Sequence, residues 1–313
     1  MSDIDVRLLR VFRAVVEAGG FANAQAILNV GASTISTQMS QLETRLGYVL
    51  CHRGRGRGGF RLTDKGEALY RLVIEFFQSV HNFEMQAGEL RGGMNGQLRI
   101  GFIDNVITDH NSPLRRAMER FRQQPRNQAR LLLEVLTPQE LERGLQEHRI
   151  DIALGVFYAR LNGLTYEPLY LQKDVLVCHH THPLASITDE SDLAAALPTA
   201  NKVLRSFIGT QEFPFASPDG QTMTASINHV EAAALLILTG DCIGFLPYHY
   251  ARQWIDTGEL VALMPDKLFR ETQFSVAMRS DQLRLPPALH AFLSCLRSEQ
   301  RQMAGTDSVH IAA

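Results

Sequence analysis

Residues 21–46, FANAQAILNVGASTISTQMSQLETRL, decide the fold of the amino-terminal region. Apolar residues recur at helical spacing in 21–28 and again in 32–46, and Asn29-Val30-Gly31 supplies a tight turn between the two stretches. The preceding stretch 6–18 has the same helical spacing. Three short helices with a three-residue turn between the last two are the geometry of a helix-turn-helix, whose final helix enters the major groove of DNA.

The outward face of the third predicted helix carries short polar side chains. Its buried stripe is marked by Ile35, Met39 and Leu42, and no Lys or Glu occurs between Ser33 and Gln41, although a solvated helix face usually carries such charges. Hydroxyl and amide side chains can approach base edges and hydrogen-bond to them. We therefore predict DNA contacts from Ser33, Thr34, Ser36, Thr37, Gln38 and Gln41.

An alternating run of Arg and Gly, RGRGRGGFRLT over 53–63, follows the three helices. Its glycines suit the tip of a hairpin, and its arginines suit phosphate or a narrow minor groove. Residues 1–66 hold nine basic and five acidic residues in a chain of net charge −2, as expected when one end meets nucleic acid. We predict a wing; a disordered charged loop is the alternative. The predicted phosphate contacts are Arg53, Arg55, Arg57 and Arg61.

A long helix is predicted over 64–90. Two apolar series with a seven-residue period run along it, as in a coiled-coil seam between two chains. An amphipathic helix packed on its own domain is the alternative reading of the same pattern. The first series is Leu69, Phe76, Phe83 and Leu90, and the second is Val73, Val80 and Ala87.

Strands and helices alternate in the carboxy-terminal two thirds, after a flexible break at 92–96. This rhythm predicts a parallel sheet covered on both faces and then a second α/β subdomain, with chain near 272–278 returning to the first. Ligands of such sheets bind at the carboxyl ends of strands, beside helix amino termini. The candidate effector-binding residues at those ends are Asn105 and Thr137 in the first subdomain and Arg205, Ser206, Asn228 and His229 in the second.

Several other classes of protein find no support in the sequence. The chain has no apolar run long enough to span a bilayer and no signal peptide, and its four scattered cysteines suit free thiols in a cytoplasmic protein. The run 178–182, CHHTH, is too crowded on one strand end to favour a metal. No catalytic motif is present, so we expect neither an enzyme nor a cofactor.

These motifs together resemble the LysR-type transcriptional regulator family over nearly the whole chain. The stretches 21–30, 34–43 and 46–47 resemble its helix-turn-helix, and 60–63 with 66–67 resembles its exit from the wing. Landmarks similar to those of its effector domain follow in order at 97–101, 150–154, 182–185 and 244–247.

The resemblance implies a mixed α/β chain: a winged helix-turn-helix (1–63), a linker helix and hinge (64–93), and a periplasmic-binding-protein-like effector domain (94–313). The two α/β subdomains of the last would cover about 94–162 with 268–300, and about 163–267. The implied partners are promoter DNA, RNA polymerase, a second copy in a dimer or tetramer, and a small, often anionic effector in the cleft between the subdomains.

The sequence departs from the family pattern at three places. Gly31-Ala32-Ser33 opens the recognition helix where Ser-Gln-Pro is common, the wing carries an additional Arg-Gly, and His148 replaces a helix-ending Gly. Half-site preference is therefore not carried over from the family. The alternative function is a small-molecule binding or enzymatic α/β domain whose basic head binds protein.

Overall fold

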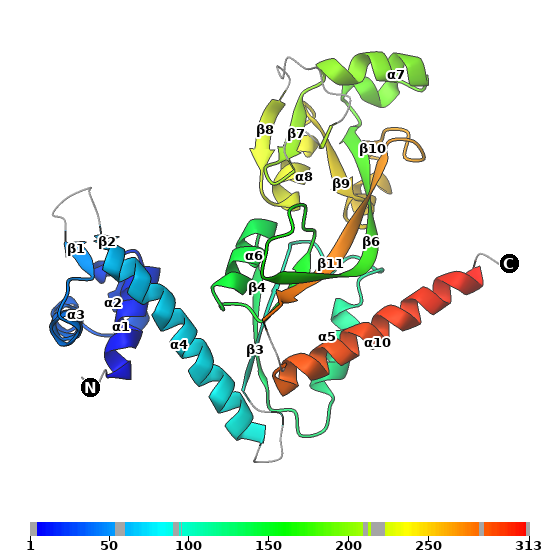
Figure 1. Cartoon of the computed structure of the whole chain (residues 1–313). Coiled ribbons are helices and arrows are strands. Elements are labelled where there is room, and N and C mark those ends of the chain that lie inside the picture. Colours follow the sequence, from blue (N-terminus) through cyan, green and yellow to red (C-terminus); the bar gives the residue numbers. More distant parts are fainter. Residues whose placement is uncertain are drawn as a thin grey trace. The chain divides into compact units, whose positions relative to one another are not determined.

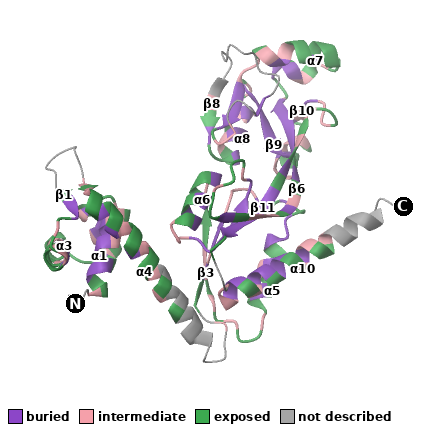
Figure 2. Ribbon diagram, in the orientation of Figure 1, coloured by how far each residue is buried: buried purple, intermediate pink, exposed green. Residues whose placement is uncertain are grey.

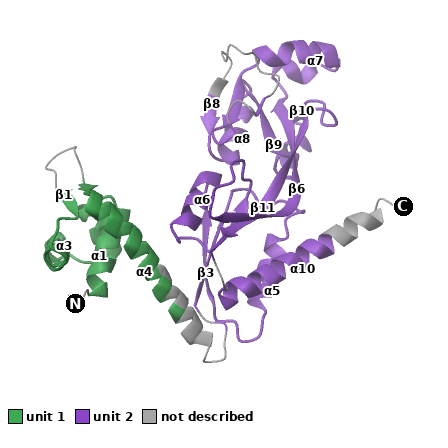
Figure 3. Ribbon diagram, viewed as in Figure 1, with its two compact units in different colours: residues 1–84 green, residues 85–313 purple. Residues whose placement is uncertain are grey.

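The protein comprises two compact units, residues 1–84 and 85–313 (Figure 3). The computed structural model describes residues 5–53, 60–89, 94, 96–208, 212–213, 223–281 and 285–310.

The first unit is a three-helix bundle followed by a short hairpin and a long helix (Figure 1). The hairpin strands pair antiparallel, with Cys51 opposite Leu62. The predicted helix-turn-helix and the long helix therefore form as expected. The elements are α1 (Val6–Glu17), α2 (Phe21–Leu28), α3 (Ala32–Leu46), β1 (Cys51–Arg53), β2 (Phe60–Leu62) and α4 (Asp64–Glu89).

One hydrophobic core joins all four helices of this unit. Phe12 of α1 and Ile35 and Met39 of α3 are fully buried. Leu69 and Val73 of α4 belong to the same core, and the start of α4 is thereby fixed to the bundle. Burial of such side chains stabilises the unit by roughly 1.5–3 kcal/mol each.

The apolar seam of α4 divides into two parts. Its first members, Leu69 and Val73, pack inside the unit, as the alternative reading of the pattern predicted. Further along, Phe76 is 37% exposed and Phe83 is 68% exposed, and Leu72, which neither series included, is 60% exposed. The side chain of Ala87 and the whole of Leu90 lie outside the described residues. One side of α4 therefore packs on the core of its own unit, and another side presents Leu72, Phe76 and Phe83 to solvent.

The amino terminus of α3 is capped by a side chain from α2. Gly31 occupies the N-cap position and has no side chain to accept a bond. Oε1 of Gln25 instead accepts the N–H of Ala32 at 3.2 Å. Asn29 takes the left-handed conformation that turns the chain between α2 and α3. The unusual Gly31-Ala32-Ser33 entrance is thus supported from the preceding helix.

A small hydrogen-bonded lock ties α3 and α4 to the start of the hairpin. Oε1 of Glu43 accepts the N–H of Leu50 at 2.8 Å, and Thr63 N–H donates to Leu50 O at 2.9 Å. Oγ1 of Thr63 accepts the N–H of Gly66 at 3.0 Å and so caps α4. A Cβ at Gly66 would lie only 2.0 Å from Leu50 O, so this close approach requires glycine.

Nine strands of the described residues form one continuous sheet in the second unit. Its order is β4-β3-β5-β11-β6-β9-β7-β8, with β10 paired to β6. The strands are β3 (Gln97–Phe102), β4 (Arg130–Val135), β5 (Ile152–Gly155), β6 (Leu164–His179), β7 (Lys202–Arg205), β8 (Met223–Ile227), β9 (Ile243–Pro247), β10 (Leu260–Ala262) and β11 (Phe269–Arg279).

The predicted parallel strands form, but the sheet as a whole is mixed. At one end β4, β3 and β5 are parallel, and at the other end β8, β7 and β9 are parallel. Between these groups β6 and β11 run antiparallel to each other, from Leu164 opposite Arg279 to Val175 opposite Phe269. These two long strands connect two α/β subdomains, which a reading of local alternation could not reveal.

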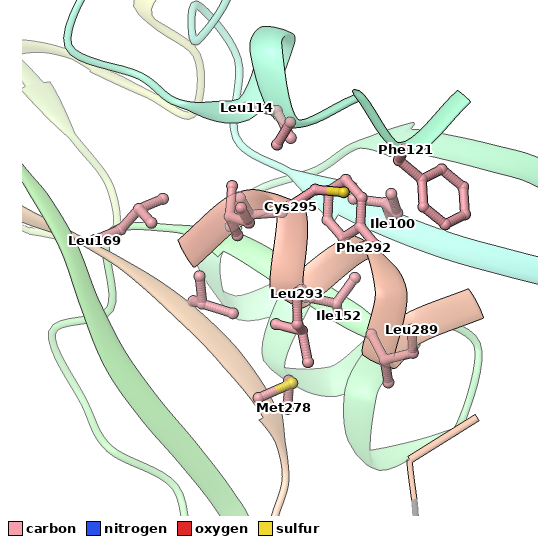
Figure 4. Close-up of a cluster of buried hydrophobic side chains, with 14 of the residues drawn as sticks. Ile100, Leu114, Phe121, Ile152, Leu169, Met278, Leu289, Phe292, Leu293 and Cys295 are labelled. Carbon is pink, nitrogen blue, oxygen red and sulfur yellow. The ribbon is translucent and has the colours of Figure 1, made fainter. Parts of the chain in front are cut away.

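Helices cover both faces of each subdomain. The first contains α5 (Leu114–Arg122) and α10 (Pro287–His310) on one face and α6 (Pro138–Gln146) on the other. Phe121 and Phe292 meet edge to face at 5.8 Å in the first of these cores (Figure 4). The second subdomain contains α7 (Glu190–Ala196), α8 (Val230–Leu238) and α9 (Tyr248–Ile255), with short 3-10 turns at Pro183–Ser186 and Leu197–Thr199.

Burial follows this layering. Strand β9 is buried along its whole length, whereas α7 exposes most of its residues (Figure 2). At the sheet edge, Leu133 and Val135 of β4 are each 51% exposed.

Replacement of Gly66 by Ala tests the lock between α4 and the hairpin. The new methyl group would collide with Leu50 O, so we expect a loss of stability of about 1–3 kcal/mol. Hydrogen exchange of the full-length chain should then show faster exchange in residues 5–53. Glu75→Ala, an exposed change on the same helix, is the control and should leave the exchange rates unchanged; equal rates in the two variants would contradict the lock.

Candidate DNA-binding surface and effector cleft

The outward face of α3 forms a shallow open hollow. Ser33, Thr37 and Gln41 are exposed and Ser36 is half-buried, so four predicted base contacts lie together. Thr44 and Arg45, one turn further on, share this face and were not predicted, although the helical period could have placed them there. The residues that line the hollow are Ser33, Ser36, Thr37, Ser40, Gln41, Thr44 and Arg45.

Two of the predicted contacts lie beside this hollow. Thr34 is exposed but does not line it. Gln38 is half-buried, and its Oε1 is buried with no hydrogen-bond partner among the described residues. On the face itself, the Thr37 hydroxyl donates to Ser33 O at 3.0 Å, so its oxygen remains an acceptor toward a base.

The described part of the hairpin holds one predicted phosphate contact whose side chain can be placed. Arg61 is exposed on β2. Arg53 ends β1, but its side chain lies outside the described residues. Arg55 and Arg57 also lie outside them, as does the hairpin tip between β1 and β2.

A narrow cleft separates the two subdomains of the second unit. Strand ends of the first subdomain face the amino terminus of α8 and the end of β7, and the cavity of about 20 Å3 has room for one or two waters. Its lining residues are Ile103, Asp104, Leu136, Thr137, Pro138, Val156, Tyr158, Gln172, Arg205, Phe207, Asn228, Val230 and Pro247.

Asp104 bridges the cleft. It follows Ile103, just after the end of strand β3. Its Oδ2 accepts the N–H of Val230, the first residue of α8, at 2.7 Å. His229 is the N-cap residue of α8, yet its own side chain makes no capping bond. A carboxylate is favoured at this position because the helix dipole and the open N–H groups attract negative charge. Burial nevertheless raises the pKa of Asp104 above its ordinary value.

The amino terminus of α6 is satisfied within the first subdomain. Thr137 and Glu140 form a capping box: Oγ1 of Thr137 accepts Glu140 N–H at 3.4 Å, and Oε2 of Glu140 accepts Thr137 N–H at 2.9 Å. These bonds from Thr137 lower the pKa of Glu140. Both helix termini at the cleft thus have a carboxylate of this chain beside them.

Arg205 lines the cleft, but its charge is paired with carboxylates of the protein itself. Its guanidinium contacts Asp174 at 2.8 Å and Glu212 at 2.7 Å, and all three side chains are at most 7% exposed. Arg270 also reaches Asp174, at 2.9 Å. Burial alone would lower the pKa of Arg205, but the two carboxylates raise it. The group is therefore a permanently charged member of a buried ionic cluster.

The other predicted effector contacts have separate places. Asn228 lines the cleft and hydrogen-bonds to Ser206, which is exposed and does not line it. The side chain of His229 is 47% exposed, and its Nδ1 lies 3.7 Å from Asp104. Asn105 takes a left-handed conformation and is bonded by Thr108 of its own loop, outside the lining. Thr137, Arg205 and Asn228 are therefore the predicted residues that the cleft brings together.

Sequence reasoning missed several lining residues. Asp104 precedes the predicted Asn105 by one position, and its place just after a strand end could have identified it as a lining residue. Tyr158, Gln172 and Phe207 come from loops and from the long strand β6, which the sequence alternation did not resolve.

The loop after β3 makes a second contact with the other subdomain. Thr108 Oγ1 lies 3.0 Å from His249 Nδ1, and Asp109 lies 3.6 Å from His249 Nε2. His249 belongs to the first turn of α9. One loop of the first subdomain therefore contacts the amino termini of both α8 and α9, which makes it the link across the cleft.

Comparison with known families and structures agrees with this architecture. Residues 6–67 match the bacterial regulatory helix-turn-helix protein, lysR family, and residues 91–301 match the LysR substrate binding domain. The HTH-type transcriptional activator BauR of Pseudomonas aeruginosa is 33% identical over 279 residues, which are 89% of this chain and 90% of BauR.

Solved structures share the fold at low sequence identity. CbnR in complex with its target DNA has a TM-score of 0.62 at 21% identity, covering 95% of this chain and 100% of CbnR. LysG of Corynebacterium glutamicum with its bound effector Arg has a TM-score of 0.52 at 17% identity, covering 96% and 99%.

The chain belongs to the LysR family of bacterial transcription regulators. It is a DNA-binding regulator with an effector-binding domain. Among the described residues, no helix is long and apolar enough to cross a membrane, and no cluster of three or more His, Cys, Asp or Glu side chains is placed to hold a metal.

Replacement of Arg205 by Ala separates a structural from a ligand-binding role. Removal of one partner leaves buried carboxylates unpaired, so we expect a loss of about 3–5 kcal/mol in unfolding free energy. Trp254, the single tryptophan of the chain, lies in this unit and reports its urea unfolding by fluorescence. Arg252→Ala breaks an exposed ion pair with Asp256 and should cost less than about 1 kcal/mol. Similar losses in both variants would refute the buried cluster.

The raised pKa of Asp104 predicts a pH dependence. The folded state holds this proton more tightly than the unfolded state, so stability falls as pH rises from the ordinary value of 3.8 through the raised pKa. Asp104→Asn cannot ionise, and its melting temperature should exceed that of the parent increasingly between about pH 4 and neutrality. Asp266→Asn, in an exposed turn, is the control. A difference that stays constant with pH would contradict the prediction.

Proposed function

We propose that α3 and the wing read an operator in duplex DNA. The support is the polar face of α3, where Ser33, Thr37 and Gln41 offer hydroxyl and amide groups that suit base edges. The basic hairpin that follows suits the phosphate backbone. The proposed contacts are Ser33, Thr34, Ser36, Thr37, Gln38 and Gln41 with bases or nearby backbone, and Arg53, Arg55, Arg57 and Arg61 with phosphate.

The exposed apolar side of α4 is the proposed dimer contact. Leu72, Phe76 and Phe83 are exposed apolar residues on one side of this helix, and a second copy of α4 would cover them. Paired heads would read paired half-sites. We propose a dimer or tetramer that acts on promoters in the cytoplasm and contacts RNA polymerase.

The proposed functions of the three parts of the chain follow the domain boundaries predicted from the sequence. Residues 1–63 would bind DNA, 64–93 would link and pair the chains, and 94–313 would bind the effector. In the effector domain, the boundary between subdomains would lie near residues 162 and 268. The protein would act by binding, without turnover of the effector.

Effector control would use the link across the cleft. Asp104 and Thr108 each hold the amino terminus of a helix in the other subdomain, α8 and α9 respectively. A ligand that enters between Thr137 and Asn228 would change these contacts. It shifts the regulator only by as much as its affinity differs between the two arrangements of the subdomains.

One observation supports the proposed base reading, namely the polar hollow on α3. Substitution of the residues that line this hollow tests the proposal. Thr37→Ala and Gln41→Ala should each weaken binding to a site selected from random duplexes by about 1–3 kcal/mol. Binding to a scrambled duplex should change much less, because it depends on phosphate contacts. Fluorescence anisotropy measures both affinities, with Gln253→Ala on α9 as the control. An equal loss on both duplexes would rule out base reading by these residues.

Arg61→Ala supplies the complementary measurement. A phosphate contact should weaken both duplexes alike and reduce the slope of log affinity against log salt by about 1. An unchanged slope would remove Arg61 from the phosphate contacts.

A further inference from the structure

The charges that line the cleft do not suit an anion. Asp104 and Arg205 are the charged residues among the described lining. Arg205 is held between Asp174 and Glu212 at ion-pair distance, and Arg270 adds the second positive charge of that cluster. Two arginines balance two carboxylates there, so the cluster contributes no net charge. The carboxylate of Asp104 is then the formal charge that remains at the cleft.

Each of the two helix amino termini at the cleft already has a carboxylate of this chain beside it. Thr137 and Glu140 form a capping box at α6. Asp104 accepts the first N–H of α8. An anionic effector at either terminus would lie a few ångströms from a carboxylate of the protein, and like charges at that distance disfavour each other.

Asp104 itself retains capacity for a ligand. An ionised carboxylate offers about four acceptor positions; the bond from Val230 uses one of them, and His229 Nδ1 lies 3.7 Å from the same oxygen, Oδ2. The Asp104 side chain is 23% exposed, so it is accessible from the cleft while being largely removed from water. Burial deprives this carboxylate of stabilisation by water. A cation placed beside the carboxylate would replace that stabilisation.

We propose that the effector carries an ammonium group that pairs with Asp104. This inference rests on the proposed effector role of the cleft and reverses the expectation of an anionic effector. Tyr158, Gln172 and Asn228 add neutral polar side chains to the lining, and Gln172 and Asn228 also hydrogen-bond to Asp174 and Ser206. The effector class is therefore an amine or an amino acid, and a dicarboxylate is the competing class.

Thermal shift and calorimetric titration of the full-length chain with matched probes test the charge requirement. The probes are aliphatic diamines, ω-amino acids and dicarboxylates of two to six carbons, together with the common α-amino acids. A bound ligand raises the melting temperature because it stabilises the state that it binds. We expect the rise with ammonium-bearing probes and none with dicarboxylates.

Asp104→Asn then assigns the contact. Asn keeps the shape and can still accept the N–H of Val230, so α8 remains capped. The affinity for the ammonium-bearing probe should fall at least tenfold, whereas Asp266→Asn should change it less than twofold. Stabilisation by dicarboxylates alone, unchanged affinity in Asp104→Asn, or no response to any ammonium-bearing probe would each overturn the inference.

Asn228→Ala distinguishes a failure of the ammonium inference from a failure of the proposed effector site. A dicarboxylate that binds the parent and is lost in Asn228→Ala would leave the cleft as the effector site and refute only the ammonium group. A ligand whose affinity is insensitive to both Asp104 and Asn228 binds elsewhere, and that result would count against the cleft itself.

Discussion

A buried ionic cluster fixes the centre of the effector domain. Asp174 is fully buried on β6 and meets Arg205 from β7 and Arg270 from β11, and Glu212 completes the balance. Charges removed from water are tolerated only when they are paired, so this arrangement of the strands is the one in which all four side chains find partners. Asp174 and Arg270 lie on the long strands that connect the two subdomains, β6 and β11. The cluster therefore joins strands of the shared sheet, and it leaves no net charge of its own for a ligand.

The helical head was more predictable than the sheet. The boundaries of helices α1 to α3 are marked by local signals, and apolar spacing placed their ends to within about a residue. The pairing of β6 with β11 joins segments about a hundred residues apart. No local pattern encodes such a pairing, so alternation of strands and helices suggested a parallel sheet where a mixed one forms.

The same reasoning explains the outcome for the cleft. Strand ends drew attention to Thr137, Arg205 and Asn228, which line the cleft, because chain position along a strand is a local property. The partners of Arg205 lie 31 residues before it and 7 after it, and only folding brings them to its guanidinium. Asp104 differs from the predicted Asn105 by one position, but Asp104 lines the cleft whereas Asn105 takes a left-handed conformation and is bonded within its own loop. The boundaries of helices and strands thus depend mainly on local sequence, whereas the roles of residues at the cleft depend on tertiary contacts.

The cap on α3 has a consequence for how such a regulator can change its target. Gln25 holds the start of the recognition helix from outside, so residues 32 and 33 carry no capping duty of their own. Substitutions at these two positions can alter the exposed start of α3 while the fold remains supported by α2. Under the proposed role of α3, evolution of operator preference is thereby separated from the maintenance of stability, and new binding sites become reachable by single steps through folded intermediates.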